Sequence, residues 1–323
     1  MKKYKAAFVT NYQEKIDYVY TAAQQQEIAE LTGLLPGVFC EADILAGKLL
    51  KTEVIFATWG MPALTAEMMD KMPKLQAVFY GAGATDSFAR ACFARDVKVF
   101  SAWQANAIPV AEFCLGQILL GLKGYFRYAR SLNCKERFNQ QLAGPGCYGE
   151  TVALIGAGAI STKLKELLGA FNIKVEVVPS RKEKRTVSLE EVFAKAMVIS
   201  NHLPDRNDNI GVLDGKLFAS MREGAVFINT GRGRQVNEAE MIEVLKKRPD
   251  LTALLDVTSP EPPENGSELY TLPNVFLSAH IAGSLNDEVH RMADYMIAEY
   301  KRFASGEENL YEVKESMLLT SKQ

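Results

Sequence analysis

VALIGAGAIS, at residues 152–161, carries an apolar segment directly into a glycine-rich turn, and a helical pattern follows over 162–171. This order of strand, turn and helix is the context that a dinucleotide-binding fingerprint requires. Gly156 allows the tight turn, and Gly158 lets the backbone approach a pyrophosphate at the start of the helix. A glycine pair that serves only as a structural turn is the alternative interpretation. We predict cofactor contacts at Gly156, Gly158, Ala159 and Ile160.

The residues after the next predicted strand bear on the choice of cofactor. The strand spans 174–178, and Pro179, Ser180 and Arg181 follow it where an NAD-binding protein would place a carboxylate for the ribose 2′-hydroxyl. Ser180 and Arg181 suit a 2′-phosphate, so we predict NADP(H) in preference to NAD(H). A solvated basic loop is the alternative. Ser161 replaces the third glycine of the fingerprint, at a position that serves close packing of helix on strand.

Short apolar segments alternate with helical patterns along the whole chain, as in an α/β protein with mainly parallel sheets. A long helical stretch from about Pro109 to Arg130 separates two such series, and a last amphipathic helix runs from Asn286 to near Gly306. Strands are predicted at 6–10, 54–58, 75–80 and 97–100, and then at 151–155, 174–178, 197–201, 225–229, 251–256 and 275–278.

The composition is that of a globular protein. A chain of 323 residues suggests two domains, and a net charge of −2 offers no basic excess to recruit nucleic acid or an anionic membrane. The apolar segment Ala6–Val9 is too short for a signal sequence, and no run approaches the about 20 apolar residues of a membrane span. We therefore predict a soluble, cytoplasmic protein with no nucleic-acid or membrane partner.

The cysteines predict neither a disulfide framework nor a zinc site, because their number is odd, their spacing is wide and no CxxC occurs. They are Cys40, Cys92, Cys114, Cys134 and Cys147. Reduced thiols fit a cytoplasmic protein, and we predict no bound metal.

Three later segments hold residue types that suit acid–base chemistry on an anionic substrate: a proton donor, a carboxylate and a cation. His280 can donate a proton near neutral pH, and a carboxylate at Glu261 beside it would favour the imidazolium form. Arg232 presents a planar fork that suits a carboxylate. The segments are AVFINTGRG at 225–233, LDVTSPEP at 255–262 and LPNVFLSAHIAG at 272–283.

Each of these residues also has a structural alternative. His280 would then be a satisfied turn residue, Glu261 part of a rigid loop between two prolines, and Arg232 an ion-pair partner. Arg234 is a neighbouring alternative to Arg232.

Together with the glycine turn, in this order and at these spacings, the segments resemble the D-isomer-specific 2-hydroxyacid dehydrogenases, an NAD(P)-dependent family. The family's N-T-x-R-G, D-V-x-x-x-E-P and L-P-N-V-x-x-x-x-H-I-A-G patterns have counterparts here, and the likeness extends through 80–86 and 106–112. We predict two Rossmann-like α/β domains with parallel sheets. The dinucleotide-binding domain, 106–286, would be inserted into a discontinuous substrate domain made of 1–105 and 287–323.

The resemblance implies roles for particular residues. His280, Glu261 and Arg232 would be catalytic, and Asp256 would accept a hydrogen bond from the nicotinamide carboxamide. The substrate carboxylate would receive backbone N–H groups from Tyr80, Gly81, Ala82 and Gly83. Further cofactor contacts are predicted at Ser180, Arg181, His202, Leu203, Pro204, Thr230 and Gly231.

The implied reaction is reversible hydride transfer between NAD(P)H and C2 of a small 2-keto acid, in a cleft between the domains. A homodimer would form through the helix after Pro109, whose apolar length an internal core would equally explain. Formate dehydrogenases of the same superfamily have Gln in place of Glu261, so that activity is disfavoured. Ser278-Ala279 precedes His280 where the family often has Thr-Pro, a departure that leaves the mechanism plausible.

Two other functions stay open at this point. One is a non-enzymatic, NAD(H)-sensing scaffold like the corepressors that share this fold. The other is an enzyme on a phosphorylated acid such as 3-phosphoglycerate, which would need further cations in the substrate domain, with Arg90, Arg95 and Lys98 as candidates. Aromatic residues that would line a side-chain pocket, or else belong to the core, are Trp59, Phe79, Tyr80 and Trp103.

Overall fold

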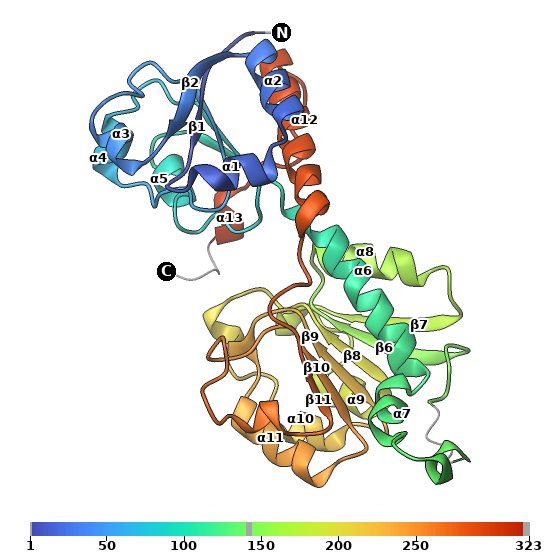
Figure 1. The fold of residues 1–323 in the computed structure, drawn as a ribbon. Coiled ribbons are helices and arrows are strands. Elements are labelled where there is room, and N and C mark those ends of the chain that lie inside the picture. Colours follow the sequence, from blue (N-terminus) through green and yellow to red (C-terminus); the bar gives the residue numbers. More distant parts are fainter. Residues whose placement is uncertain (1, 140–143, 319–323) are drawn as a thin grey trace. The chain divides into compact units, whose positions relative to one another are not determined.

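The structure is a computed structural model that describes residues 2–139 and 144–318 (Figure 1). The chain forms two compact units, and the second is inserted into the first. Unit 1 comprises Met1–Asn106 and Ser284–Gln323, and unit 2 comprises Ala107–Gly283. Each unit is built on one parallel β-sheet with helices on both faces. The predicted α/β class, with one domain inserted into the other, is confirmed.

Unit 1 has a five-stranded parallel sheet in the order β2-β1-β3-β4-β5. Strand β2 was not predicted, because Pro36 and Gly37 interrupt its apolar pattern, and such residues occur in sheets mainly at edges. The strands are β1 (Lys5–Val9), β2 (Gly33–Phe39), β3 (Val54–Ala57), β4 (Ala77–Tyr80) and β5 (Lys98–Ser101).

Helices cover both faces of this sheet. Residues of α1, α2 and the C-terminal helix α12 form one hydrophobic cluster with the sheet, and α3, α4 and α5 form the other. The predicted apolar face of α12 is buried, so this helix completes unit 1. The bounds are α1 (Gln13–Val19), α2 (Ala22–Leu31), α3 (Glu41–Leu45), α4 (Ala66–Asp70), α5 (Ala89–Phe93), η6 (Asn286–Val289), α12 (His290–Ser305) and α13 (Glu315–Leu318).

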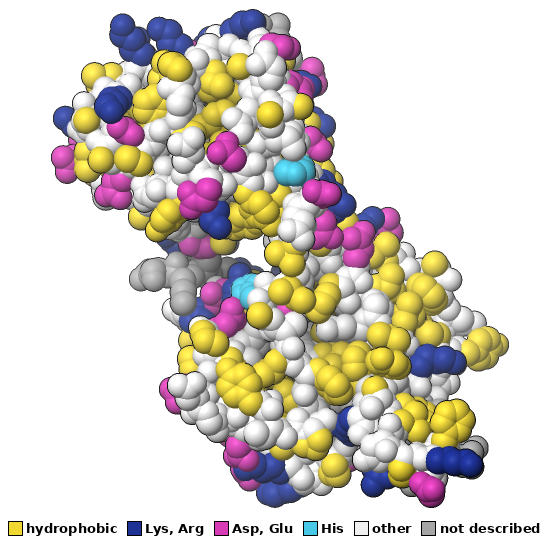
Figure 2. All heavy atoms as spheres, viewed as in Figure 1, with side chains coloured by type: hydrophobic (Ala, Val, Ile, Leu, Met, Phe, Trp, Pro, Cys, Tyr) yellow, Lys and Arg dark blue, Asp and Glu magenta, His cyan; other side chains and the backbone are white. Residues whose placement is uncertain are grey.

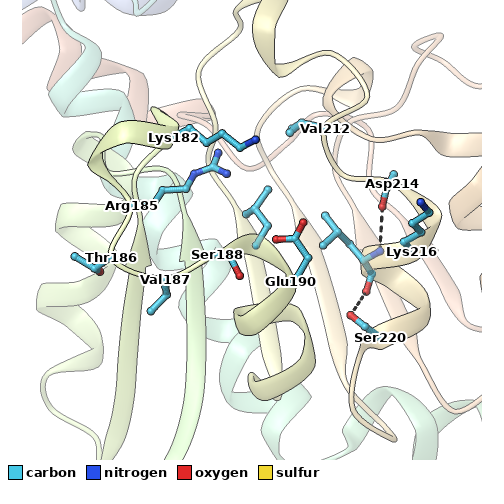
Figure 3. Close-up of a pocket in the computed structure, with 12 residues that line it drawn as sticks. Lys182, Arg185, Thr186, Val187, Ser188, Glu190, Val212, Asp214, Lys216 and Ser220 are labelled. Carbon is cyan, nitrogen blue, oxygen red and sulfur yellow. Dashed lines mark hydrogen bonds between the residues drawn. The ribbon is translucent and has the colours of Figure 1, made fainter.

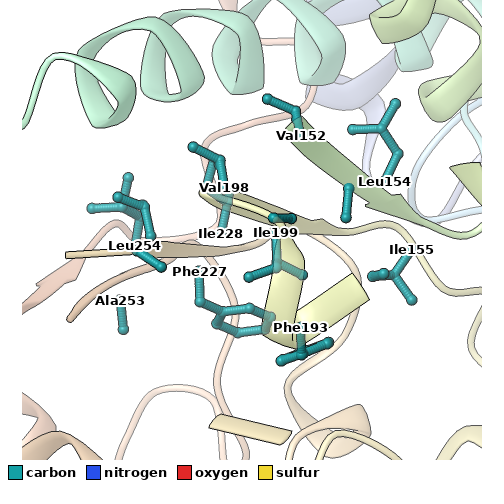
Figure 4. Close-up of a cluster of buried hydrophobic side chains, with 14 of the residues drawn as sticks. Val152, Leu154, Ile155, Phe193, Val198, Ile199, Phe227, Ile228, Ala253 and Leu254 are labelled. Atoms are coloured by element: carbon teal, nitrogen blue, oxygen red, sulfur yellow. The ribbon is translucent and has the colours of Figure 1, made fainter. Parts of the chain in front are cut away.

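Unit 2 has a six-stranded parallel sheet in the order β11-β10-β9-β8-β6-β7. Branched and aromatic side chains from its central strands form the core, which Figure 4 shows around Phe193, Phe227 and Ile228. The strands are β6 (Glu150–Ile155), β7 (Ile173–Val178), β8 (Val198–Asn201), β9 (Val226–Asn229), β10 (Thr252–Leu255) and β11 (Val275–Leu277).

The helices of unit 2 lie in two layers, with α6 and α8 on one face of the sheet and α9, α10 and α11 on the other (Figure 1). The α-helices are α6 (Trp103–Leu122), α7 (Tyr125–Ser131), α8 (Ala159–Leu168), α9 (Leu189–Lys195), α10 (Gly215–Ser220) and α11 (Glu238–Lys247). The 3-10 turns are η1 (Lys135–Asn139), η2 (Lys182–Lys184), η3 (Asn207–Asn209), η4 (Gly233–Gln235) and η5 (Glu268–Tyr270).

Helix α6 differs from its prediction in two respects. It begins at Trp103, so Pro109 lies inside it, and the predicted single helix is divided where Gly124 adopts a φ of 72°. Among the described residues, α6 is also the one helix long and apolar enough to cross a membrane, although no such run was expected. Half of that apolar window is buried within the structure, and a buried core helix meets the same criteria.

Each sheet has one point where the chain reverses the direction in which strands are added. In unit 1 the reversal lies between β1 and β3, and in unit 2 it lies between β6 and β8. In open parallel sheets, ligands bind outside the carboxyl ends of the strands at such a switch point. The loops after these four strands are therefore the places to look for binding groups.

Phe79→Ala tests the aromatic core of unit 1, because the Phe79 ring is fully buried and stacks on Phe56 and Phe100 at 5.2 and 4.9 Å between centroids. We expect the free energy of unfolding to fall by about 3–5 kcal/mol. Both tryptophans lie in unit 1, so their fluorescence in a urea titration follows this unit. Leu50→Ala, at an exposed side chain, is the control and should cost less than about 0.5 kcal/mol. A loss below about 1 kcal/mol for Phe79→Ala would contradict this placement.

Candidate functional site

The two glycines of the fingerprint meet different surroundings. Gly156 has a φ of 113°, and a Cβ added to it would lie 2.4 Å from the backbone oxygen of His202. Gly156 is therefore required by both its conformation and the close approach of the next loop at the switch point. Gly158 is the N-cap of α8, and a Cβ added to it would have nothing within 4 Å, so it borders open space.

The start of α8 fits the pyrophosphate of a dinucleotide. No side chain caps this helix, and within the described part of the chain the N–H groups of Ala159 and Ile160 have no acceptor. Unpaired N–H groups and the positive end of the helix dipole together favour an anion. Ser161 is buried on the packed side of the helix, as the fingerprint's third position requires.

The end of β7 carries more ordered cations than were predicted. Arg185 donates from Nε to the oxygen of Pro179 and from Nη2 to that of Ser180, both at 2.9 Å. Arg206 donates to the Ser180 hydroxyl at 3.3 Å. Arg181, the predicted contact, is exposed. Arg185 and Arg206 were missed because no motif marks them, and they reach the strand end only through their side-chain conformations.

The guanidinium of Arg206 forms an ion pair with Asp208. Its Nε and Nη2 donate to Asp208 at 2.7 and 2.5 Å, and these hydrogen bonds hold the pKa of Asp208 below its usual value. The carboxylate of Asp208 is therefore paired with a guanidinium, and the strand end carries this ion pair in addition to the cation of Arg185.

A pocket of about 500 Å³ opens next to this strand end, between the segment after β7 and helix α10 (Figure 3). Lys182 and Arg185 lie at the same end of it, and Val187, Leu189 and Val212 supply apolar walls. Glu190, Asp214 and Lys216 also line the pocket, which therefore carries charges of both signs. Its two cations beside apolar walls suit a planar base joined to an anionic group.

His202 is the first residue after β8, and its imidazole is buried. Its Nε2 lies 2.9 Å from the Ser200 hydroxyl and its Nδ1 lies 3.2 Å from that of Thr230. Burial lowers the pKa of His202 to about 3, so the ring is neutral at physiological pH. A neutral, buried imidazole is a poor proton donor near neutral pH, and the cofactor contact predicted at His202 stays a prediction.

A buried amide network joins the carboxyl ends of β8 and β9. The Asn201 amide donates to the side-chain oxygens of Asn229 and Gln235 at 2.9 and 2.8 Å. Gln235 in turn donates to the backbone oxygens of Leu203 and Pro204, both at 2.9 Å. These three amides, which the sequence analysis did not single out, shape the loop where cofactor contacts were predicted.

The same network places Arg232. Its backbone N–H donates to the Gln235 side chain at 3.0 Å, and its Nη1 donates to the oxygen of Gly231 at 2.7 Å. The Arg232 side chain is 45% exposed, and its Nε lies 4.0 Å from Asp205. Arg234 instead makes a 2.5 Å ion pair with Asp205 and is 21% exposed. Arg232 is thus the more available cation, and Arg234 has a structural role.

Asp256, directly after β10, holds the loop that carries His280. Its Oδ1 accepts from the Ser278 hydroxyl at 2.6 Å and from the N–H of Ile281 at 2.9 Å, and its Oδ2 accepts from the N–H of Ala282 at 3.0 Å. Its backbone oxygen accepts from the N–H of His280 at 3.0 Å. The loop is thereby fixed with His280 in the left-handed region, at a φ of 55°.

The structure brings His280 and Glu261 together. The Nδ1 of His280 lies 2.6 Å from Oε1 of Glu261, and both side chains are about half exposed. The segment with Arg232 meets the segment with Glu261 at Gly233, where an added Cβ would lie 1.9 Å from the backbone oxygen of Thr258. The three segments singled out by sequence are therefore neighbours, all within unit 2.

The predicted substrate loop, residues 80–83, lies in unit 1, and fewer of its backbone N–H groups are available to a ligand than the sequence predicted. Tyr80 ends strand β4, and its ring is buried against Phe88. The N–H groups of Gly81 and Ala82 donate to the oxygens of Ala57 and Tyr80, both at 2.8 Å. Gly81, Ala82 and Gly83 all follow the strand. Among these three described residues, only Gly83 has a backbone N–H without an acceptor.

The glycine pair yields a test with opposite outcomes. Gly156→Ala should lower the free energy of unfolding by more than about 1 kcal/mol, because its Cβ would strike His202 and φ is positive. Gly158→Ala should leave stability within about 0.5 kcal/mol, because its Cβ meets no protein atom. Gly158→Ala should nevertheless weaken dinucleotide binding at least about tenfold, because its added Cβ would occupy the space of the pyrophosphate. Urea unfolding, followed by circular dichroism, measures stability, and titration with the cofactor measures binding. Equal losses of stability and of binding in the two variants would contradict the distinct roles given to Gly156 and Gly158.

Comparisons with known proteins agree with this geometry. Residues 115–282 match the family model described as D-isomer specific 2-hydroxyacid dehydrogenase, NAD binding domain. YoaD of Bacillus subtilis (strain 168), whose name places it among the 2-hydroxyacid dehydrogenases, is 33% identical over 202 residues, 59% of each chain. D-3-phosphoglycerate dehydrogenase of Methanocaldococcus jannaschii is 27% identical over 274 residues, 81% of this chain and 52% of that one. The chain thus spans between about half and three fifths of these two relatives.

Solved structures share the fold over nearly the whole chain. The TT0316 protein of Thermus thermophilus has a TM-score of 0.72 at 24% identity and covers 96% of this chain and 100% of that one. D-mandelate dehydrogenase of Rhodotorula graminis has a TM-score of 0.77 at 19% identity and covers 97% and 98%. With the family match over more than half of its residues, the chain belongs to the D-isomer-specific 2-hydroxyacid dehydrogenase family, and unit 2 is its NAD(P)-binding domain.

Proposed function

We propose that this protein is an NADP(H)-preferring reductase of small 2-keto acids, which interconverts them with D-2-hydroxy acids. The observation that carries the proposal is the 2.6 Å contact between Nδ1 of His280 and Glu261, on a loop that Asp256 holds in place. A half-exposed histidine paired with a carboxylate has the geometry of a general acid. The bound dinucleotide would supply the hydride.

His280 is the proton donor in this proposal. With Nδ1 turned to Glu261, its Nε2 is the nitrogen that gives a proton to the substrate oxygen as C2 accepts the hydride. The imidazole is then neutral and regains its proton from solvent, which its half exposure permits. Glu261 fixes the orientation of the ring through its contact with Nδ1. In the reverse direction the same nitrogen accepts the hydroxyl proton.

Arg232 is the proposed anchor for the substrate carboxylate. Its guanidinium keeps donors beyond the one bonded to Gly231, and it can also polarise the keto oxygen. Asp256 keeps acceptor capacity on Oδ2, which receives a single hydrogen bond, so it can also orient the nicotinamide carboxamide as the resemblance implies.

The preference for NADP(H) rests on charge at the end of β7. Lys182 and Arg185 line one end of the adjacent pocket, Arg181 is exposed beside them, and the Ser180 hydroxyl is held by Arg206. A 2′-phosphate would gain charge-assisted hydrogen bonds there.

A homodimer and a cytoplasmic location belong to the same proposal. Apolar side chains gather on the surface over α6 and α7, where Leu120 is exposed, and such a patch favours association (Figure 2). Size-exclusion chromatography of the full chain, compared with Leu120→Glu, distinguishes a dimer from a monomer.

His280→Ala tests the acid. We expect kcat for 2-keto acid reduction to fall by about 10²–10⁴-fold, because the proton donor is lost. Glu261→Gln should cost about 10- to 100-fold, the worth of a charge-assisted hydrogen bond. The control is His290→Ala, whose ring contacts the oxygen of Val19 in unit 1. No turnover of any 2-keto acid by the parent protein, with cofactor binding retained, would favour the NAD(H)-sensing scaffold instead.

Arg181→Ala and Lys182→Ala test the cofactor preference. Each should raise KM for NADPH about tenfold, the loss of one charge-assisted contact, with little change for NADH, which has no 2′-phosphate. Lys174→Ala, at the amino end of the same strand β7, is the matched control. Equal losses with both cofactors, or a lower KM for NADH in the parent protein, would contradict the assignment.

A further inference from the structure

Two arginines lie on either side of one carboxylate, beside the proposed anchor for the substrate. Nε of Arg234 donates to Oδ1 of Asp205 at 2.5 Å, and Nη2 of Arg234 lies 2.5 Å from the same oxygen. Nε of Arg232 lies 4.0 Å from Oδ2 of Asp205. All three residues belong to unit 2. The carboxylate therefore has a close cation on one oxygen and a more distant cation on the other.

The backbone of the loop after β8 holds Asp205 beside these guanidinium groups. Asp205 directly follows Leu203 and Pro204, whose oxygens accept from the buried side chain of Gln235 at 2.9 Å each. The same side chain accepts from the backbone N–H of Arg232 at 3.0 Å. One buried amide thus joins the loop that carries Asp205 to the segment that carries Arg232. The backbone positions of these two opposite charges are therefore fixed relative to each other.

A carboxylate at this distance competes for the ligand site that Arg232 is proposed to provide. The carboxylate of Asp205 and that of a 2-keto acid are the same chemical group, and each seeks the same guanidinium donors. The side chains of Arg232 and Asp205 are 45% and 29% exposed, so neither is held rigidly by packing. Without another cation beside it, Asp205 would pair with Arg232 and neutralise it.

Arg234 is the other cation that Asp205 needs. Besides its contacts with Asp205, its Nη1 donates to the side-chain oxygen of Asn207 at 3.4 Å, and its side chain is only 21% exposed. This guanidinium is therefore more tightly held than that of Arg232. With two arginines around one aspartate, one positive charge is left in excess. That excess resides on Arg232, the arginine with the longer contact and the greater exposure.

We propose that Arg234 is a positioning residue, which occupies Asp205 and thereby keeps Arg232 free for the carboxylate of a 2-keto acid. The inference rests on the proposed reductase function and adds to it the group that sets the affinity of the anchor. Arg234 acts through the charge of Asp205 and does not itself contact the substrate. Loss of Arg234 would let Asp205 close the 4.0 Å gap to Arg232 and compete with the substrate.

Calorimetric titration of the full chain, saturated with NADPH, with oxamate tests the proposal, because oxamate is an unreactive analogue of a 2-keto acid. Arg234→Ala should raise the Kd of oxamate about tenfold, the worth of one charge-assisted contact. It should raise KM for a 2-keto acid equally and leave kcat within about twofold, because a bound substrate has already displaced Asp205. Arg234→Lys keeps the charge and should stay within about threefold of the parent protein.

The decisive variant combines Arg234→Ala with Asp205→Asn. It should return the Kd of oxamate to within about twofold of the parent value, because no competing charge remains. A merely structural role for Arg234 predicts no such rescue, and neither does a direct contact between Arg234 and the ligand. Failure of the rescue, or an unchanged Kd in Arg234→Ala alone, would therefore overturn the inference.

Arg222→Ala is the matched control. It removes the same charge from an ion pair of the same unit, in which Arg222 lies 2.8 Å from Glu150 at the amino end of β6. Because the carboxyl ends of the strands carry the proposed site, this variant should leave the Kd of oxamate unchanged. An equal loss in Arg222→Ala would assign the effect to net charge and overturn the role of Arg234.

The binding measurement also separates this inference from the reductase function. Oxamate binding with the expected pattern, but without turnover of any 2-keto acid, would support the inference and refute the reductase. Turnover with a KM that does not respond to Arg234→Ala would leave the reductase standing and overturn the inference. If turnover occurs without measurable oxamate binding, the KM values of the same variants decide in the same way. Absence of both binding and turnover would overturn both proposals.

Discussion

The buried carboxylate of Asp256 is the group on which the proposed chemistry depends. Removing an ionised carboxylate from water is costly unless hydrogen bonds replace its hydration. Here a hydroxyl and two backbone N–H groups do so, and all three belong to the loop around His280. The same hydrogen bonds that make the buried charge tolerable thereby fix a histidine in a left-handed conformation, from which its ring reaches Glu261.

A second buried network fixes the backbone at Arg232, as Asp256 fixes the loop that carries His280. The side chains of Asn201, Asn229 and Gln235 satisfy one another at the carboxyl ends of β8 and β9, and Gln235 also holds the backbone of Arg232. Amides suit this task because each offers both donors and acceptors without a charge that would compete with a bound anion. The more exposed proposed catalytic groups are therefore positioned by buried polar groups, which are the three amides and the hydrogen-bonded carboxylate of Asp256.

The sequence predicted those features of the fold and the site that short motifs determine. The strand–turn–helix around Gly156, the parallel sheets and the pairing of His280 with Glu261 followed from motifs and their order. Arg185 and Arg206 did not, because a flexible side chain can point in many directions and only packing selects one. For the Tyr80 ring the sequence left a side-chain pocket and the core as alternatives, and its burial in the structure chooses the core.

Ser278 departs from the family pattern but keeps the hydroxyl group of the usual residue. Where related sequences often have threonine, this chain has serine, and its hydroxyl donates to Asp256 at 2.6 Å. Either residue brings a hydroxyl that can donate to the buried carboxylate, so the exchange costs a methyl group and keeps the hydrogen bond. The position is therefore constrained by its hydroxyl, and Ser278→Ala would leave Asp256 short of a donor in a place that water does not readily reach.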